Sequence, residues 1–299
     1  MWVILAFVAA FFNGCYDISK KMAVNNSAIL PVLLLSTLFA FLLLSPAILV
    51  SYLYPDRIIN TLFYAPALSI ESHPYIFLRA AIIVSAWLFG YSAIKNLPIT
   101  ITGPVNATRP VMTLALAMMI FHEALNIYQW IGVFITMVSL FLLSSSSKKE
   151  GVKFSRNQWI VFAFLGALIG SLSELYEKFL MQQFDVVTVQ FWTSVYQCLI
   201  ITVVMLVAKV SHPKRKFNPG FKWSILFIAL FLMLTDFAYL YALSCTGAMI
   251  SIISLIRRSS VLVSFAGGIV FFKERNIKAK IIDLVLMIVG MFFLFLGAA

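Results

Sequence analysis

Ten apolar stretches, each long enough to cross a lipid bilayer, constrain the fold of this sequence more than any other feature. A membrane-spanning helix needs about 20 consecutive apolar residues. With a mean hydropathy of +1.00 and only 11% charged residues, the 299-residue chain is too apolar for a soluble domain. The sequence therefore predicts an all-α integral membrane protein with ten transmembrane helices. The stretches are approximately residues 2–19, 29–53, 74–94, 97–121, 126–146, 158–177, 186–208, 223–245, 247–271 and 277–298.

The basic residues are divided unequally between the connections of these stretches. Of the 22 Lys and Arg residues, sixteen fall in the connections that follow the odd-numbered stretches, whereas Arg57, Arg79 and Lys178 fall on the opposite side. Cytoplasmic loops carry the excess of Lys and Arg in membrane proteins. We therefore expect a multi-pass protein of the inner or plasma membrane with both termini outside the cytoplasm. The net charge of +11 then reflects topology and does not indicate a nucleic-acid partner.

The chain contains an internal repeat. The segments "FNGCYDISKK" (12–21) and "IGSLSELYEK" (169–178) both place an acid one helical turn before a lysine, as Asp17 with Lys21 and Glu174 with Lys178. Farther along, the segment that starts at residue 109 aligns with the segment from residue 259 at a constant shift of 151, which matches Glu123 with Glu274. Both alignments indicate that the second half of the chain repeats the first.

The repeat predicts the domain organisation. Residues 1–147 form one five-helix half, residues 158–299 form the other, and a basic loop at 148–157 joins them. Because each half has an odd number of spans, the second half enters the membrane from the opposite side. Such inverted repeats are common in secondary transporters, in which the substrate site lies near the membrane midplane between the repeats.

Several charged residues lie inside the apolar stretches. A single arginine at the centre of a membrane helix costs about 2.5–3.5 kcal/mol, so these residues must face water, pair with opposite charges or reach the interface. Residues of this kind are by default candidates for a functional site. They are Asp17, Arg109, Glu174, Glu177, Asp236, Arg257 and Arg258.

The fourth stretch carries a polar stripe at helical spacing. Thr102, Asn106, Arg109 and Thr113 are separated by four, three and four residues, so they share one face of an otherwise apolar helix. The shift of 151 puts Arg257 and Ser260 on the equivalent face of the ninth stretch. We expect these six residues, together with Asp236, to bind the substrate. Because the guanidinium fork suits planar oxyanions, paired arginines favour a substrate with a carboxylate or phosphate. If the arginines are instead held by Asp236 and Glu174, a neutral or zwitterionic substrate is favoured.

The roles of the acids and of Arg257 have alternatives. Arg257 either lines the cavity or forms a salt bridge with Asp236 or Glu174. Asp17 and Glu174 either carry a proton in a coupled cycle or pair with the lysines four residues later. Asp236 has no basic neighbour in its own stretch, which makes it the better candidate for proton coupling or for a pair with Arg257. Pro104 and Pro110 either break the fourth helix beside its polar stripe or only curve it.

The remaining reactive residues do not form a recognisable constellation. The three cysteines and three histidines are scattered over separate segments, so the sequence predicts no metal site, no cofactor and no catalytic nucleophile. The alternatives to a transporter are a channel or scaffold without a coupled cycle and an integral-membrane enzyme. The adjacent pair His122 and Glu123 offers too little for the latter.

The spacing of Pro110, Glu123, Gln129 and Gly132 resembles the fourth and fifth helices of the EamA-type repeat in the drug/metabolite transporter superfamily. The second half keeps Glu274 and also has Gly290, but it has Val261, Lys280 and Asp283 where the pattern has the proline, the glutamine and the glycine. The resemblance covers essentially the whole chain and implies a ten-helix secondary transporter that alternates between the two sides of the membrane. It also implies that the glutamate at the start of the fifth and tenth helices is structural and caps a helix N-terminus.

The resemblance further implies a small polar metabolite as the substrate, such as an amino acid, an organic anion, or a phosphorylated or nucleotide sugar. Transport would be proton-coupled or run as exchange. Membrane lipids are the other expected partner, and the oligomeric state stays open, with a homodimer among the alternatives.

Overall fold

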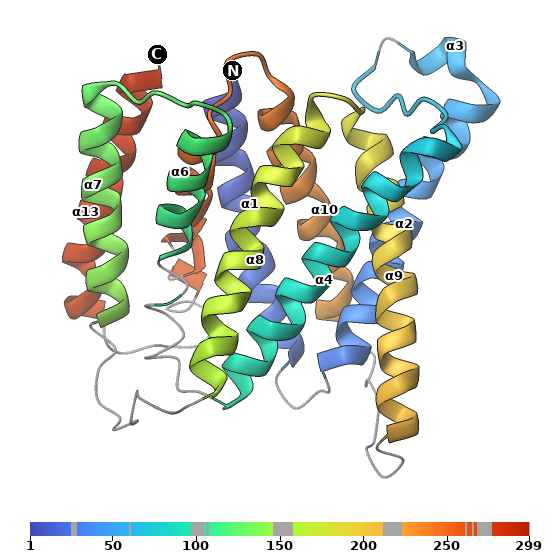
Figure 1. Cartoon of the computed structure of the whole chain (residues 1–299), viewed down its shortest axis with the longest axis horizontal. Coiled ribbons are helices and arrows are strands. Elements are labelled where there is room, and N and C mark those ends of the chain that lie inside the picture. The colour runs from blue at the N-terminus through green and yellow to red at the C-terminus, as the bar shows by residue number, and fades with distance from the viewer. Residues whose placement is uncertain are drawn as a thin grey trace.

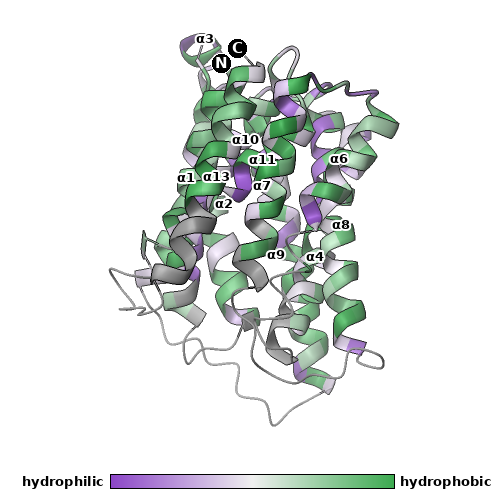
Figure 2. Cartoon of the chain, turned by 90° about the vertical axis from the view of Figure 1, so that its left-hand side faces the viewer, coloured by the Kyte–Doolittle hydropathy of each residue, from purple (hydrophilic) through white to green (hydrophobic). Residues whose placement is uncertain are grey.

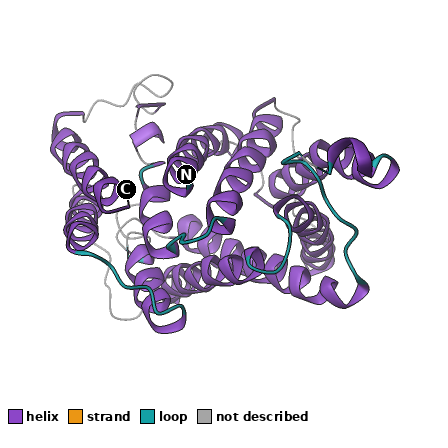
Figure 3. Ribbon diagram, turned by 90° about the horizontal axis from the view of Figure 1, so that it is seen from above, coloured by secondary structure: helices purple, strands orange, loops and turns teal. Residues whose placement is uncertain are grey.

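The computed structural model describes residues 1–24, 29–59, 61–96, 105, 108–145, 158–211, 223–260, 262–264, 266–267 and 277–298. All regular structure within these residues is helical, and the helices run side by side as an elongated bundle (Figures 1 and 3). Both chain ends lie at the same end of this bundle (Figure 1). The elements are α1 (Trp2–Val24), α2 (Ile29–Leu53), α3 (Pro55–Ile58), η1 (Ile70–Ser72), α4 (His73–Asn96), α6 (Arg109–Ile120), α7 (Ile127–Ser145), α8 (Gln158–Met181), α9 (Val186–Ser211), α10 (Trp223–Ser244), α11 (Ile250–Arg258) and α13 (Ile277–Ala298).

Each of the ten apolar stretches contains a helix. Within the described residues, six helices are long and apolar enough to cross a membrane, namely α1, α2, α4, α8, α9 and α10, and three shorter apolar helices cover 109–120, 127–139 and 285–297. The helices are predominantly hydrophobic along their length, with polar residues confined to short patches (Figure 2). The multi-pass membrane protein is therefore confirmed, whereas the count of ten spans and the inverted repeat stay predictions.

The structure describes the fourth stretch at Val105, which is helical, and from residue 108 onward. Its described helix, α6, begins only at Arg109, and Pro110 occupies the first turn. A proline at this position costs nothing, because the first amides of a helix have no intrahelical partner. Pro110 therefore starts α6 and does not break it. Gly103 and Pro104 lie outside the described residues.

The helices pack in defined pairs. The most extensive contacts are α1 with α10, α4 with α8, α7 with α13 and α2 with α9, followed by α4 with α9 and α2 with α10. The short helices α6 and α11 contact each other, while α6 also lies on α8 and α11 on α1.

Two glycines set the close approach of α7 and α13. A Cβ atom added to Gly132 would lie 2.7 Å from Leu294 Cγ and 2.8 Å from the carbonyl oxygen of Gly290. A Cβ atom added to Gly290 would in turn collide with Thr136. Small residues let membrane helices approach in this way, which gives a packing role to Gly132 of the sequence pattern and to Gly290.

The helix α11 lies in the interior of the bundle. All residues from Ile250 to Ile256 are buried, including two serines, so no face of this part of the helix is exposed. Its last two residues are Arg257 and Arg258. Cations are favourable at a helix C-terminus, and this end of α11 carries both arginines into the candidate site.

Candidate functional site

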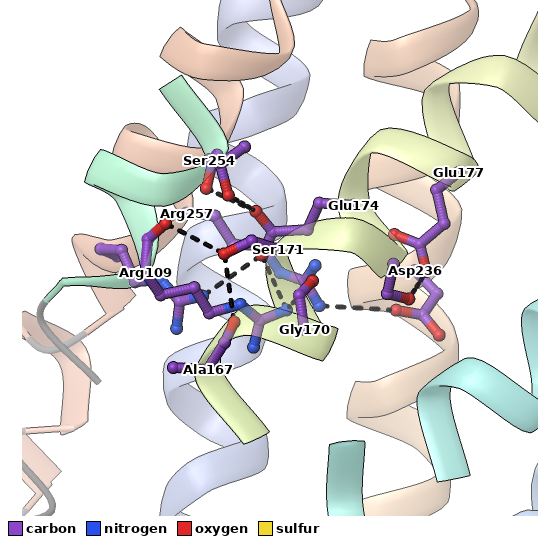
Figure 4. A network of polar contacts seen from close by, with 12 residues as sticks. Arg109, Ala167, Gly170, Ser171, Glu174, Glu177, Asp236, Ser254 and Arg257 are labelled. Carbon is purple, nitrogen blue, oxygen red and sulfur yellow. Dashed lines mark hydrogen bonds and ion pairs between the residues drawn. The ribbon is translucent and has the colours of Figure 1, made fainter. Parts of the chain in front are cut away.

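The site is built around the carboxylate of Glu174, which is 1% exposed and lies on α8 (Figure 4). Its Oε2 atom accepts hydrogen bonds from Thr113 Oγ1 at 2.9 Å and from Ser254 Oγ at 2.6 Å. Its Oε1 atom lies 2.9 Å from Arg109 Nη2 and 3.2 Å from Arg258 Nη2. One carboxylate thus links α8 to α6 and to α11.

This arrangement corrects one interpretation of the sequence. Glu174 does not pair with Lys178, the lysine one turn later on its own helix, because Lys178 Nζ lies 2.6 Å from Glu123 Oε1. Arg109 and Arg258 replace it as the partners of Glu174. They come from helices that only the tertiary fold brings together.

Two guanidinium groups therefore share one carboxylate. The side chains of Arg109 and Arg258 keep 25% and 26% of their surface exposed, whereas that of Glu174 keeps 1%. The Nε atoms of both arginines are buried and have no hydrogen-bond partner among the described residues. The Glu174 centre, which we define as Glu174, Arg109 and Arg258, thus carries one surplus positive charge among its own three residues, and Asp17 also interacts electrostatically with Arg258.

The backbone of α8 fixes the position of Arg109. Its Nη2 donates to the carbonyl oxygen of Gly170 at 2.7 Å, and its own carbonyl oxygen accepts a hydrogen bond from Ser171 Oγ at 3.2 Å (Figure 4). A Cβ atom added to Gly170 would lie 2.5 Å from Arg109 Cζ. The guanidinium group can reach Glu174 only because residue 170 has no side chain.

We expect Gly170→Ala to displace Arg109 and to weaken any binding that depends on it, while the protein still folds. The guanidinium is the far end of a flexible side chain and can move, so we expect a loss of about 1–3 kcal/mol of stability, as for other overpacked sites. Thermal unfolding of the purified protein measures this loss. Gly90→Ala is the matched control, since nothing lies within 4 Å of its added Cβ, and an equal effect of both variants would contradict the assignment.

A second ion pair joins α11 to α10. Arg257 Nη2 lies 3.8 Å from Asp236 Oδ1, and the two side chains keep 20% and 25% of their surface exposed. The guanidinium carbon of Arg257 lies 4.4 Å from the centre of the Tyr239 ring, a cation–π contact. Of the alternatives for Arg257, the ion pair with Asp236 is thus present, and Arg257 remains partly accessible.

A third ion pair was not expected from the sequence. Arg79, which the distribution of charges assigns to the opposite membrane face, is 1% exposed inside the bundle. Its Nη2 lies 3.1 Å from Glu177 Oε1, and its Nη1 donates to Thr193 Oγ1 at 2.6 Å. The only signal in the sequence is that Arg79 comes several residues after the start of an apolar stretch.

A fourth ion pair among the described residues joins Lys178 of α8 to Glu123, which follows α6 and contacts the start of α11. Glu123 accepts hydrogen bonds from the backbone amides of Ile250 at 2.7 Å and Ser251 at 3.2 Å, and also from the Ser251 hydroxyl. Lys178, which forms the ion pair with Glu123, also lies over the Phe121 ring, with its Nζ atom 4.6 Å from the ring centre. Glu123 therefore caps a helix N-terminus as expected, but the helix is α11 of the other half of the chain.

The helix that comes after Glu123 in the chain has a different cap. The amide of Gln129 donates to Asn126 Oδ1 and the amide of Asn126 donates to Gln129 Oε1, both at 2.9 Å. This reciprocal pair is a capping box. It explains why Gln129 belongs to the recognised sequence pattern.

The other predicted site residues lie in different parts of the bundle. Thr113 binds Glu174, whereas Ser260 lies on the α1 side, where it accepts a hydrogen bond from Asn13 Nδ2 at 3.0 Å. Asp17 interacts electrostatically with Lys20, Arg257 and Arg258. Thr102 and Asn106 lie outside the described residues, as do Glu274 and the side chain of Lys21. Within the described part of the chain, no group of three or more His, Cys, Asp or Glu side chains could hold a metal ion.

Comparison with known proteins gives a family match and a structural match. The sequence model of the EamA-like transporter family matches residues 1–145 and again residues 157–296. A solved structure described only as "Crystal structure of protein" superposes with a TM-score of 0.72 at 13% sequence identity, covering 99% of this chain and 98% of that one. This likeness concerns the fold. No curated protein gives a significant match.

Proposed function

Because the chain belongs to the EamA-like transporter family, we propose that it carries a small metabolite with a carboxylate or phosphate group across the membrane by alternating access. The surplus positive charge of the Glu174 centre supports an anionic substrate. Arg109 and Arg258 keep about a quarter of their side-chain surface exposed. Guanidinium groups form strong, directional hydrogen bonds with planar oxyanions.

The packing of the helices supports the two-half architecture that alternating access needs. The sequence repeat makes each helix of the first half equivalent to one helix of the second half. The equivalent helices are α1 and α8, α2 and α9, α4 and α10, α6 and α11, and α7 and α13. If the two halves are related by symmetry, replacing each helix of a contact by its equivalent must give another contact. The contact α1–α10 then predicts α8–α4, α4–α9 predicts α10–α2, and α6–α8 predicts α11–α1. All six of these contacts are present. The contacts α2–α9, α6–α11 and α7–α13 map onto themselves. We therefore propose two inverted repeats of five helices around a central site.

The distribution of basic residues orients this arrangement. The end of the bundle that holds both chain termini (Figure 1) is the end poor in Lys and Arg. By the positive-inside rule, we propose that this end faces away from the cytoplasm.

The test of the proposed function replaces Arg109 by glutamine. We expect Arg109→Gln to weaken anion binding about ten- to a hundredfold, because a hydrogen bond to a charged group contributes about 1.5–3 kcal/mol. Thermal shifts with succinate, L-glutamate, glucose 6-phosphate and glucose measure binding, since a ligand stabilises the folded state by mass action. Counterflow of the labelled anion in proteoliposomes then measures transport and separates a carrier from a channel or scaffold.

The matched control is Arg57→Gln, because Arg57 lies on the exposed helix α3, where its guanidinium carbon is 5.1 Å from the centre of the Tyr54 ring. We expect this variant to behave as the unchanged protein. Undiminished counterflow in Arg109→Gln would remove Arg109 from the transport path. A thermal shift with glucose and with none of the three anions would contradict an anionic substrate.

A further inference from the structure

We propose that Arg257 and Asp236 form an exchangeable ion pair: an anionic substrate takes Arg257 from Asp236, and the released Asp236 carboxylate binds a proton from solvent. Substrate and proton then occupy the transporter together and cross the membrane in the same direction. This inference rests on the proposed anion transport and adds the coupling step to it.

Among the ion pairs of the described residues, the Arg257–Asp236 pair has the longest separation. Its closest atoms are 3.8 Å apart, compared with 2.6 Å between Lys178 and Glu123. At this separation the pair has Coulomb attraction but no hydrogen bond, since such bonds are about 2.7–3.2 Å long. Both side chains are also partly exposed. An incoming oxyanion that offers Arg257 direct hydrogen bonds therefore competes well against Asp236.

Tyr239 holds Arg257 in place during such an exchange. Its ring lies under the guanidinium group at 4.4 Å, and the ring itself is 1% exposed. The Tyr239 hydroxyl is buried and has no hydrogen-bond partner among the described residues. The aromatic contact does not depend on Asp236, so the arginine stays positioned when its carboxylate partner changes.

The charges around Asp236 determine whether its released carboxylate takes up a proton. Apart from Arg257 on α11, the cation that interacts with Asp236 is Arg79 on α4. Arg79 is already bound to Glu177 on α8 at 3.1 Å, and Glu177 repels Asp236. Once the anion neutralises the charge of Arg257, Asp236 is a largely buried carboxylate whose other cation, Arg79, is bound to Glu177. Protonation of Asp236 is then the least costly outcome.

The other helices packed against α10 do not supply a substitute cation. The helix α2 contains no charged residue, and the single charged residue of α9, Lys209, lies near its carboxyl end. The helix α1 carries Asp17, Lys20 and Lys21 in its last two turns. Glu174, the other carboxylate of α8, is occupied by its own two arginines.

Glu174 is by contrast a poor proton carrier, although the sequence made it a candidate. Its two oxygens accept from Thr113, Ser254 and Arg258 and lie against Arg109. Donors to both oxygens stabilise the ionised carboxylate. These contacts favour Asp236 as the group that binds the proton.

Proton uptake on binding tests the exchange directly. Titration calorimetry at pH 7.5 with succinate, L-glutamate and glucose 6-phosphate, repeated in buffers with different ionisation enthalpies, gives the number of protons bound per anion. We expect about one proton per anion in the unchanged protein, and this measurement needs no variant. In Asp236→Asn we expect proton uptake near zero together with tighter anion binding, because an amide does not compete for Arg257. Asp56→Asn, on the exposed helix α3, is the matched control.

Gradient-driven transport provides the second measurement. In proteoliposomes with an acidic exterior, the unchanged protein should accumulate the bound anion above equilibrium, whereas Asp236→Asn should only equilibrate it. Anion binding without proton uptake in the unchanged protein would overturn the exchange and leave the proposed anion transport standing. Anion binding with full proton uptake in Asp236→Asn would exclude Asp236 as the acceptor. Failure of all three anions to bind would contradict the proposed function itself, and the exchange with it.

Discussion

Replacing Glu123 by alanine is expected to destabilise the protein by about 3–5 kcal/mol, the usual cost of removing one partner of a buried ion pair. Lys178, whose side chain is 10% exposed, would lose its only carboxylate partner within the described residues. The amides of Ile250 and Ser251 would lose their acceptor at the same time, and a lost helix cap alone costs about 0.5–2 kcal/mol. Thermal unfolding in detergent measures the loss, with Glu71→Ala in the exposed helix η1 as the control.

The double variant Glu123→Ala/Lys178→Met separates the two contributions. Removing the lysine eliminates the unpaired buried charge but does not restore the cap of α11. We therefore expect the double variant to regain more than half of the stability lost in Glu123→Ala and to remain less stable than the unchanged protein. A double variant as unstable as Glu123→Ala would show that the ion pair contributes little and that the cap dominates.

The helices were predictable because the membrane imposes them. A backbone surrounded by lipid must satisfy its hydrogen bonds internally, so each long apolar stretch has to form a helix. The bounds of α8 and α10, Gln158–Met181 and Trp223–Ser244, lie within four residues of the predicted stretches. The start of α6 at Arg109 was not anticipated. A proline such as Pro110 is compatible both with the first turn of a helix and with a kink inside a longer one. The sequence alone therefore does not locate the start of α6.

The partners of the buried charges could not be predicted in the same way. Local spacing suggested Glu174 with Lys178, but Glu174 contacts Arg109, which is far away in the sequence, and Lys178 contacts Glu123. Spacing along one helix identifies the residues that share a face of that helix. It does not identify the neighbouring helix that packs against this face, because that depends on tertiary packing, including close approaches at glycines such as Gly170. The pair of Arg257 with Asp236 was among the alternatives for Arg257, because those alternatives were already contacts between helices.

Replacing Arg79 by methionine is expected to have a comparably large effect. Methionine fills a similar volume, so the main consequence is that Glu177, whose side chain is 7% exposed, keeps its charge without the guanidinium 3.1 Å away. Thr193 Oγ1 also loses its donor from Arg79. We expect a loss of about 3–5 kcal/mol in thermal or denaturant unfolding, and Arg57→Met on the exposed helix α3 should cost little.

The double variant Arg79→Met/Glu177→Leu decides whether this pair stabilises the fold or serves the neighbouring site. Replacing a whole buried ion pair by apolar residues is often neutral or stabilising, so we expect the double variant to unfold near the temperature of the unchanged protein. Its proton uptake should nevertheless change, because Glu177 and Arg79 both interact with Asp236. Full stability with unchanged proton uptake would show that the Arg79–Glu177 pair is needed neither for folding nor for proton binding at Asp236. The influence of Glu177 and Arg79 on Asp236 that we propose would then be wrong.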